Sequence, residues 1–272
     1  MDLDLENKIV IISGAAGKKG SIGETIVQYV ANERAIPVLV DRNDRGYDYA
    51  QKLRSQDIDS LFVKADLTSP DDIEHAIDRV IEKYGRIDVL INNVGVNDSL
   101  DLESSYEEFM DSLKLNLVSY FLMTKFTLPW LKISKGNILN IGSKVAITGQ
   151  GGTSGYAAAK GGVLALTREW AVDLLKYNIR VNCLIVAESW TPAYESWIKA
   201  QSDYQLRLQA IKQKIPLENR MTTPEEIANM ALVLISGKSS HTTGQHIFID
   251  GGYVHLDRVL VGSAIKENNV KN

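Results

Sequence analysis

The sequence predicts an α/β fold in which a doubly wound, mostly parallel sheet of seven strands carries helices on both faces. Short apolar runs rich in Ile and Val alternate with longer amphipathic stretches along all 272 residues. Near-continuous apolar runs are typical of parallel strands, because such strands are buried on both faces. The repeated alternation of strand and helix is typical of an open, doubly wound sheet, and the length suits one domain over residues 1–272.

The seven predicted strands are the apolar runs at residues 8–13, 36–41, 60–66, 87–93, 136–143, 179–186 and 245–250. Helices are predicted between them, for example over 70–84 and 224–236. Each of these two helices starts with a capping hydroxyl followed by proline, at Ser69-Pro70 and at Thr223-Pro224. Residues 189–216 form a long stretch rich in Trp and Tyr, which predicts an inserted helical lid with Tyr194, Trp197 and Tyr204 in its core.

Composition and charge exclude several classes of protein. The formal net charge is -4, and no basic cluster exceeds Lys18-Lys19, which disfavours nucleic-acid binding. The single cysteine, Cys183, excludes an internal disulfide and fits a reducing compartment. The first residues are acidic and predict no signal peptide, and no apolar run approaches the ~20 residues of a membrane span, so we expect a cytoplasmic protein. The four histidines lack ligand spacing, which predicts no metal site: His75, His241, His246 and His255.

A glycine-rich loop, residues 13–23, follows the first predicted strand. A P-loop needs Gly-Lys-Ser/Thr, whereas this loop has Lys19-Gly20-Ser21, so that interpretation is set aside. A dinucleotide loop needs glycines for a tight turn, for close approach to pyrophosphate and for helix packing, roles that Gly14, Gly20 and Gly23 can fill. A glycine-rich turn without a ligand is a serious alternative for this loop taken alone.

An acidic residue, Asp41, ends the second predicted strand. A carboxylate there can accept both hydroxyls of the adenosine ribose and would repel a 2′-phosphate. The alternative is a solvated loop aspartate, and the basic Lys19 and Arg42 favour NADP. Because a carboxylate facing a phosphate is costly, Asp41 carries more weight and the sequence predicts NAD, with NADP left open.

The pair Tyr156 and Lys160 is the most informative chemical feature. Residues four apart share one helix face, and a Lys beside a phenol favours phenolate, which brings the phenol pKa from about 10 toward neutrality. Such a group can act as a general base toward an alcohol. A lone pair of this kind is more often an ordinary surface pair. Here Ser143 ends a buried strand thirteen residues earlier, and Asn116 is a polar residue on an apolar helical stretch.

Together these residues resemble the short-chain dehydrogenase/reductase family over residues 6–255, which implies a Rossmann-like fold and hydride transfer with a nicotinamide cofactor. The motifs occur in order: the glycine loop, Asp66-Leu67, Asn92-Asn93-Val94-Gly95, Asn116, Ser143, Tyr156 to Lys160, Arg180-Val181-Asn182, Thr191 and Asp250-Gly251-Gly252.

The resemblance implies a role for each catalytic residue. Tyr156 would be the acid/base, and Lys160 would lower its pKa and hold the nicotinamide ribose. Ser143 would hydrogen-bond the substrate oxygen, and Asn116 would hold a water that links Lys160 to solvent. Cofactor contacts are expected from Ser13, Gly14, Gly20, Ser21, Ile22, Gly23, Asp41, Asp66, Leu67, Asn93, Gly95, Tyr156, Lys160, Ser189 and Thr191.

Two features depart from the family pattern. The compact branch spaces its glycines Gly-x-x-x-Gly-x-Gly, and the span from Gly14 to Gly23 is three residues longer. The spacing Gly14-x-x-Gly17-x-x-Gly20 even matches the extended branch, which the Asn-Asn-x-Gly motif and the modest length oppose. The family usually has Pro-Gly after its sixth strand, where this sequence has Val186-Ala187 followed by Glu188.

Short strings around the predicted site resemble the sugar dehydrogenases of this family, in particular those that oxidise L-fucose at C1 to the lactone. A sugar needs hydrogen-bonding side chains and an aromatic platform, and such a pocket rejects analogues that lack the hydroxyls. About half of six candidates are expected to touch substrate; the alternative for each is a solvated position. They are Asn97, Asp98, Gln150, Glu188, Trp190 and Arg258.

Two rival functions are weighed. Reduction of a 3-oxoacyl carrier-protein thioester predicts NADPH and a basic docking patch, which Asp41 and the net charge oppose. A non-enzymatic NAD-binding regulator would not need the complete set of four catalytic residues. The resemblance also implies a homotetramer or homodimer, paired through the helices of Asn116 and Tyr156 and the last strand, and the apolar tail 253–265 suits a subunit contact.

Overall fold

The computed structural model describes residues 2–256 and contains a seven-stranded sheet with the order β3-β2-β1-β4-β5-β6-β7. Every neighbouring pair of strands is parallel. The strands are β1 (Ile9–Ser13), β2 (Ile36–Asp41), β3 (Leu61–Lys64), β4 (Val89–Asn92), β5 (Asn137–Ser143), β6 (Arg180–Val186) and β7 (His246–Ile249). The predicted Rossmann-like fold is confirmed, and the strand order reverses between β1 and β4, which places a ligand crevice at their carboxyl ends.

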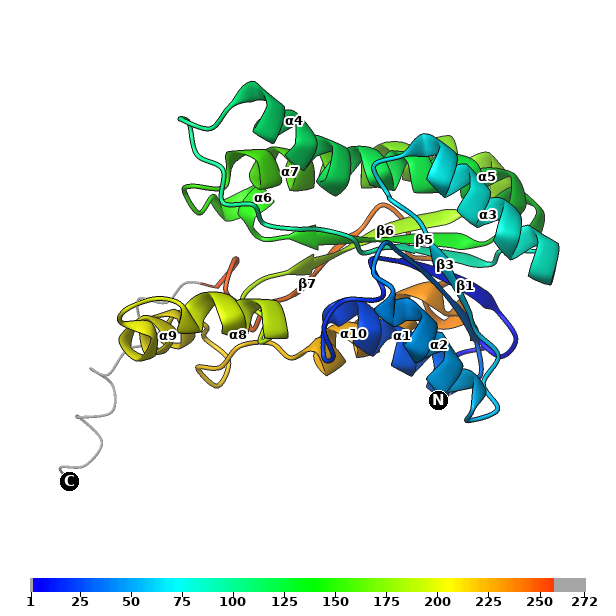
Figure 1. Ribbon diagram of the computed structural model, residues 1–272, viewed down its shortest axis with the longest axis horizontal. Coiled ribbons are helices and arrows are strands. Elements are labelled where there is room, and N and C mark those ends of the chain that lie inside the picture. Colours follow the sequence, from blue (N-terminus) through cyan, green and yellow to red (C-terminus); the bar gives the residue numbers. More distant parts are fainter. Residues whose placement is uncertain (1, 257–272) are drawn as a thin grey trace.

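Helices cover both faces of the sheet (Figure 1). One layer holds α3 (Pro70–Tyr84), α4 (Tyr106–Leu113), α5 (Ser119–Ser134), α6 (Val145–Thr148) and α7 (Ser154–Asp173). The other holds α1 (Ile22–Asn32), α2 (Arg45–Arg54) and α10 (Pro224–Ile235), with α8 (Pro192–Lys199) and α9 (Tyr204–Gln213) beyond the sheet. Short segments are the π-helix η1 (Lys114–Val118) and the 3-10 helices η2 (Leu175–Tyr177) and η3 (Gly237–Ser239).

The apolar strands are explained by burial on both faces. All five residues of β1 are buried. Successive strand residues point to opposite faces, so Val10 and Ile12 join the core under α1 and α10. Ile9 and Ile11 join the core under α3, α5 and α7. Residues 9–12 of β1 are therefore all apolar, whichever face of the sheet they point to.

The two predicted helix starts are present. The Ser69 hydroxyl accepts a hydrogen bond from Asp72 N at 3.3 Å, and Pro70 opens α3. Thr223 caps α10 in the same way and forms a capping box with Glu226. Such caps satisfy backbone N–H groups that a helix leaves without partners.

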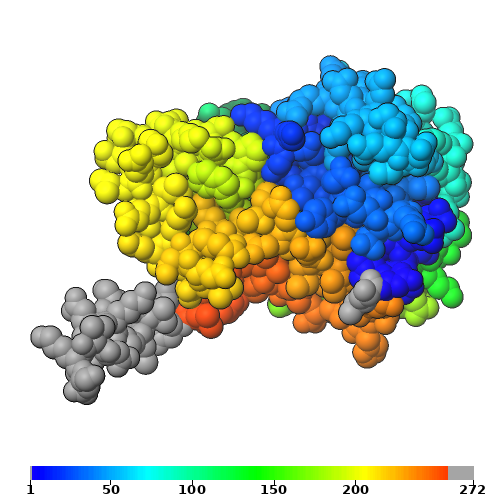
Figure 2. Space-filling model, turned by 90° about the horizontal axis from the view of Figure 1, so that it is seen from below, coloured from blue at the N-terminus to red at the C-terminus, as the bar shows by residue number. Residues whose placement is uncertain are grey.

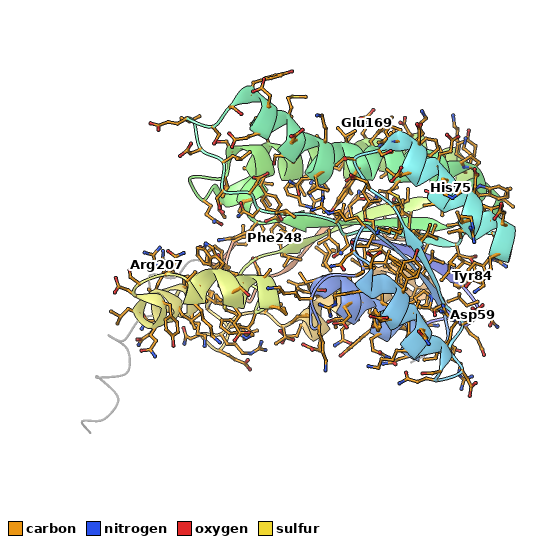
Figure 3. All side chains as sticks on the ribbon, viewed as in Figure 1. Asp59, His75, Tyr84, Glu169, Arg207 and Phe248 are labelled. Atoms are coloured by element: carbon orange, nitrogen blue, oxygen red, sulfur yellow. The ribbon has the colours of Figure 1, made fainter. Side chains whose placement is uncertain are left out.

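The carboxyl ends of the strands open toward α8 and α9. Figure 3 shows Arg207 on α9 at this end, and Tyr84 beside Asp59 at the far end, where the Tyr84 hydroxyl donates to Asp59 Oδ1 at 3.2 Å. Both helices lie within the predicted lid, residues 189–216. The prediction that Trp197 lies in the lid core is wrong: it is 42% exposed and contacts Tyr194 only edge-on, at 5.2 Å between ring centroids.

Candidate active site

The glycine loop packs against the end of β4 and leads into α1. Gly14 has φ +66°, and a Cβ there would lie 2.7 Å from Val94 Cα. At Gly23 a Cβ would lie 2.4 Å from the Gly14 carbonyl oxygen. Ser21 caps α1 by accepting from Glu24 N. Backbone that only glycine allows, next to a helix N-terminus, fits the pyrophosphate of a dinucleotide.

The glycine loop, three residues longer than in the compact-branch pattern, contacts α8. Lys18 Nζ donates to Ser196 Oγ at 3.3 Å, and a Cβ on Gly20 would contact Pro192 at 3.7 Å. Seen from the α1 face, α8 in yellow lies beside the blue amino-terminal segment (Figure 2). Within the loop, Gly20 N donates to the Glu24 carboxylate. The longer loop therefore contacts the predicted lid.

Asn93 joins β4 to the glycine loop. Its backbone N donates to Ser13 Oγ at 3.0 Å, and its amide nitrogen donates to the carbonyl oxygens of Ser13 and Gly14, both at 3.0 Å. This residue was expected to line the cofactor cleft. In the structure, the Asn93 side chain holds the glycine loop in place through these hydrogen bonds.

Asp41, the last residue of β2, contacts the glycine loop. Its Oδ2 accepts from Ala16 N at 2.8 Å, and its Oδ1 accepts from Asn43 N at 3.0 Å. Two residues after β3, Asp66 Oδ1 accepts from the backbone N and the hydroxyl of Thr68, which lowers the pKa of Asp66. Leu67 is buried. Asp41 ends β2, and Asp66 and Leu67 follow the neighbouring strand β3, so all three lie at the carboxyl edge of the sheet.

The structure brings Ser143, Tyr156 and Lys160 together. Ser143 is the last residue of β5, and its hydroxyl hydrogen-bonds the Tyr156 phenol. Lys160 lies one turn after Tyr156 on α7, with Nζ 5.6 Å from the centroid of the Tyr156 ring. Lys160 Nζ donates to Tyr120 Oη at 2.8 Å and to Ile141 O at 2.9 Å. A serine hydroxyl, a phenol and a lysine amine thus meet at one edge of the sheet.

Burial dominates the acid–base chemistry of this pair. It raises the pKa of Tyr156 to about 12, although the hydrogen bond from Ser143 lowers it. It also lowers the pKa of Lys160 to about 7. The prediction that Lys160 brings the phenol pKa toward neutrality is therefore wrong for the protein alone, because desolvation has the largest effect on that pKa.

Asn116 lies in the π-helix η1, a type of distortion often found at functional sites. Its Oδ1 accepts from Val96 N at 2.8 Å and its Nδ2 donates to Val96 O at 3.1 Å. A Cβ on Gly95 would lie 3.3 Å from both Asn116 Oδ1 and Lys160 Nζ. Asn116 therefore holds the loop after β4 close to Lys160.

The predicted substrate residues do not all converge. Glu188 forms a buried ion pair with Lys144, and the Trp190 ring lies 6.5 Å from that of Tyr194. Asn97 and Gln150 are exposed, and Asn97 Oδ1 accepts from Ser99 N. Arg258 lies outside the described residues. Two of the residues expected near the cofactor also follow β6: Thr191 caps α8, and Ser189 is buried.

Sequence reasoning missed two side chains in this region. Lys144 directly follows Ser143, and that adjacency was the available signal. Tyr120 lies one helical turn after Asn116, but nothing in its neighbourhood marked it as a partner of Lys160.

Among the described residues, no group of three or more His, Cys, Asp or Glu side chains could hold a metal ion. Residues 2–256 also contain no helix that is long and apolar enough to cross a membrane.

Comparison with known proteins identifies the family. Residues 14–254 match the family model described as enoyl-(acyl carrier protein) reductase. The chain is 35% identical to 3-oxoacyl-[acyl-carrier-protein] reductase FabG of Thermotoga maritima, over 92% of this chain and 99% of that protein. It is 32% identical to L-fucose dehydrogenase of Oryctolagus cuniculus, over 90% and 84%.

A solved structure, that of Cj0485 dehydrogenase, superposes with a TM-score of 0.90 at 42% identity, covering 96% of this chain and 99% of that one. The chain belongs to the short-chain dehydrogenase/reductase family. It is accordingly an NAD(P)-dependent oxidoreductase.

Proposed function

We propose that the protein oxidises a secondary or anomeric hydroxyl of a sugar with NAD, the best candidate being L-fucose, oxidised at C1 to L-fuconolactone. The observation that carries the chemistry is the meeting of Ser143, Tyr156 and Lys160 at the carboxyl edge of the sheet. These side chains lie near the glycine loop, since Asn93 holds that loop and the loop after Asn93 contacts Asn116.

The residues divide the reaction between them. Ser143 holds the substrate oxygen by a hydrogen bond, and Tyr156 takes the hydroxyl proton as general base. When bound, the nicotinamide ring supplies the carbon that accepts the hydride. Tyr156 needs a phenol pKa below the value of about 12 that burial gives it in the protein alone. The positive charges of Lys160 and of an oxidised cofactor lower that pKa.

The preference for NAD rests on Asp41. Its carboxylate is fixed on the glycine loop by Ala16 N, where a 2′-phosphate would meet it as a like charge. A dinucleotide would lie between the glycine loop and the ends of β2 and β3, with its pyrophosphate at Ser21, Ile22 and Gly23, where α1 begins. Asp66 and Leu67 would lie near the adenine.

Two observations support a sugar substrate. The L-fucose dehydrogenase relative covers most of the chain. Charged and aromatic groups, among them Glu188 and Trp190, also lie close to the carboxyl end of β6. We further propose that residues 189–216 act as a lid over this substrate region, because α8 contacts the glycine loop on one side and Glu188 on the other.

A second candidate is NADPH-dependent reduction of a 3-oxoacyl-[carrier protein] or another ketone. The Thermotoga maritima relative and the description of the family model favour it. Asp41 opposes its NADPH preference. A non-enzymatic NAD-binding regulator has the least support, because the four predicted catalytic residues are all present.

The test is the initial rate of nicotinamide reduction with NAD and with NADP, on L-fucose and a panel of related aldoses. Rapid NAD-dependent oxidation of L-fucose, lost in Tyr156→Phe, would support the proposal. No oxidation of any aldose, together with NADPH-dependent reduction of acetoacetyl thioesters, would instead favour the second candidate.

We also propose a homodimer or homotetramer in the cytoplasm. Apolar side chains on helices of the α5 and α7 layer are exposed, among them Phe121 at 48% and Val172 at 68%, and all four residues of the edge strand β7 are only half-buried. The buried thiol of Cys183 is compatible with a reducing compartment. Light scattering that gives the mass of a monomer would contradict the assembly.

A further inference from the structure

A buried ion pair lies beside the proposed catalytic serine. Lys144 directly follows Ser143 at the end of β5, and Glu188 lies two residues beyond Val186 at the end of β6. Ser143 and Val186 are register partners, and Lys144 N donates to Val186 O at 2.9 Å. The side chains of Lys144 and Glu188 form an ion pair and are only 8% and 12% exposed.

Aromatic residues from two other elements enclose this pair. The Tyr253 ring, from the turn after β7, lies 4.4 Å from Lys144 Nζ. Tyr194 on α8 hydrogen-bonds the Glu188 carboxylate, and burial together with the Glu188 charge raises the pKa of Tyr194. Two strand ends, the predicted lid and the segment after β7 therefore meet at the Lys144–Glu188 pair.

A third charged group acts on the proposed catalytic tyrosine. Asp98 lies in the loop after β4, and its charge, after burial, raises the pKa of Tyr156. Asp98 Oδ1 is buried and accepts no hydrogen bond from any described residue. A buried carboxylate oxygen without a protein donor is costly, and it can accept a hydrogen bond from a ligand.

A structural role explains this arrangement poorly. A buried ion pair is commonly no more stabilising than two apolar side chains of similar volume. The proton transfer assigned to Tyr156, Ser143 and Lys160 needs neither Lys144 nor Glu188. The cost of burying these charges beside the reacting atoms is explained if they bind the substrate.

We propose that Lys144, Glu188 and Asp98 bind hydroxyl groups of a vicinal diol next to the carbon that is oxidised. The ammonium donates to one hydroxyl oxygen, and each carboxylate accepts a hydroxyl proton. This inference rests on the proposed sugar oxidation and names what recognises the sugar. A 3-oxoacyl chain offers no hydroxyl beyond the reacting oxygen, so it would leave the two carboxylates without donors.

The experiment compares L-fucose with its 2-deoxy and 3-deoxy analogues on wild type and on Glu188→Gln, Asp98→Asn and the double variant Lys144→Met/Glu188→Met. The double variant removes both charges together, so it avoids a buried unpaired charge. The control is Glu195→Gln, which removes a more exposed carboxylate, paired with Lys199, on the nearby helix α8. Thermal unfolding and NADH affinity are measured for every variant.

Wild type should lose about ten- to a hundred-fold in kcat/KM on at least one deoxy analogue, because hydrogen bonds to charged groups are strong. This discrimination against the deoxy analogue should fall below about threefold in the double variant and in at least one of Glu188→Gln and Asp98→Asn. Glu195→Gln should keep the discrimination of the wild type. Unchanged NADH affinity and unfolding temperature would show that cofactor binding and folding are intact.

Full discrimination in all three variants, with L-fucose still oxidised, would overturn the diol site and leave the proposed function standing. Failure of wild type on every aldose, with reduction of an acetoacetyl thioester intact, would instead refute the proposed function, and the diol site with it.

Discussion

Replacing Tyr120 with Phe removes one hydroxyl from the centre of the candidate active site and retains the ring. That hydroxyl accepts from Lys160 Nζ at 2.8 Å and lies 3.1 Å from Val94 O and 3.0 Å from Ile141 O. Tyr120 is 0% exposed, so water does not readily replace the lost oxygen. Lys160 would keep Ile141 O as an acceptor and lose the other.

The expected cost depends on the charge of Lys160. A hydrogen bond to a charged group contributes about 1.5–3 kcal/mol, so at pH 6 we expect Tyr120→Phe to lower the free energy of unfolding by about 2–3 kcal/mol. The pKa of Lys160 is about 7, so the amine is mostly neutral at pH 9. There the lost bond is between neutral groups, and the expected cost falls to about 1 kcal/mol.

Urea unfolding followed by tryptophan fluorescence at pH 6 and pH 9 measures these costs, at one fixed protein concentration because an oligomer would make stability concentration-dependent. Tyr49→Phe is the matched control, since the Tyr49 hydroxyl donates to a neutral acceptor, Glu24 O, at 3.0 Å. It should cost about 1 kcal/mol at both pH values. The reasoning is refuted if Tyr120→Phe costs no more than this control, or the same at both pH values.

Three further predictions concern the proposed chemistry. Tyr156→Phe should lower kcat by at least about a hundred-fold with NADH affinity unchanged in a fluorescence titration, and retention of a tenth of the activity would exclude Tyr156 as the base. The free energy of unfolding of the wild type should rise from about pH 7 to about pH 9.5, because Lys160 has a pKa of about 7 when folded and about 10.4 when unfolded, so the unfolded state binds more protons. Lys160→Met should flatten this rise in urea titrations, and an identical slope would contradict the assignment. Asp41→Ser should shift kcat/KM toward NADP by at least about tenfold relative to NAD, since it removes a like charge from the phosphate, whereas an unchanged ratio would place the ribose elsewhere.

The strands could be predicted from the sequence because most of their residues are buried between two helical layers and form short apolar runs. For example, β1 lies between two helical layers, and its run Ile9 to Ile12 has no polar interruption. The starts of α3 and α10 could be predicted because a capping hydroxyl and a proline act locally. These features depend on a few neighbouring residues, or on burial that the whole strand shares.

The acid–base properties of the site could not be predicted in this way. The spacing of Tyr156 and Lys160 predicts that they share a helix face, which the structure shows. Their pKa values depend on desolvation by the surrounding layers. The side chain that accepts from Lys160, Tyr120, lies forty positions earlier in the chain. The ion-pair partner of Glu188 could not be predicted either, because its pairing with Lys144 depends on the register of β5 against β6.

The two departures from the family pattern meet at the same helix. The longer glycine loop contacts α8 through Lys18 and Ser196, and Glu188, which follows the replaced Pro-Gly, contacts α8 through Tyr194. The loop proposed to bind the cofactor and the carboxylate proposed to bind the substrate thus both contact one helix. Movement of α8 would then alter both sides of the reaction together, which is a physical reason for the two departures to occur in one chain.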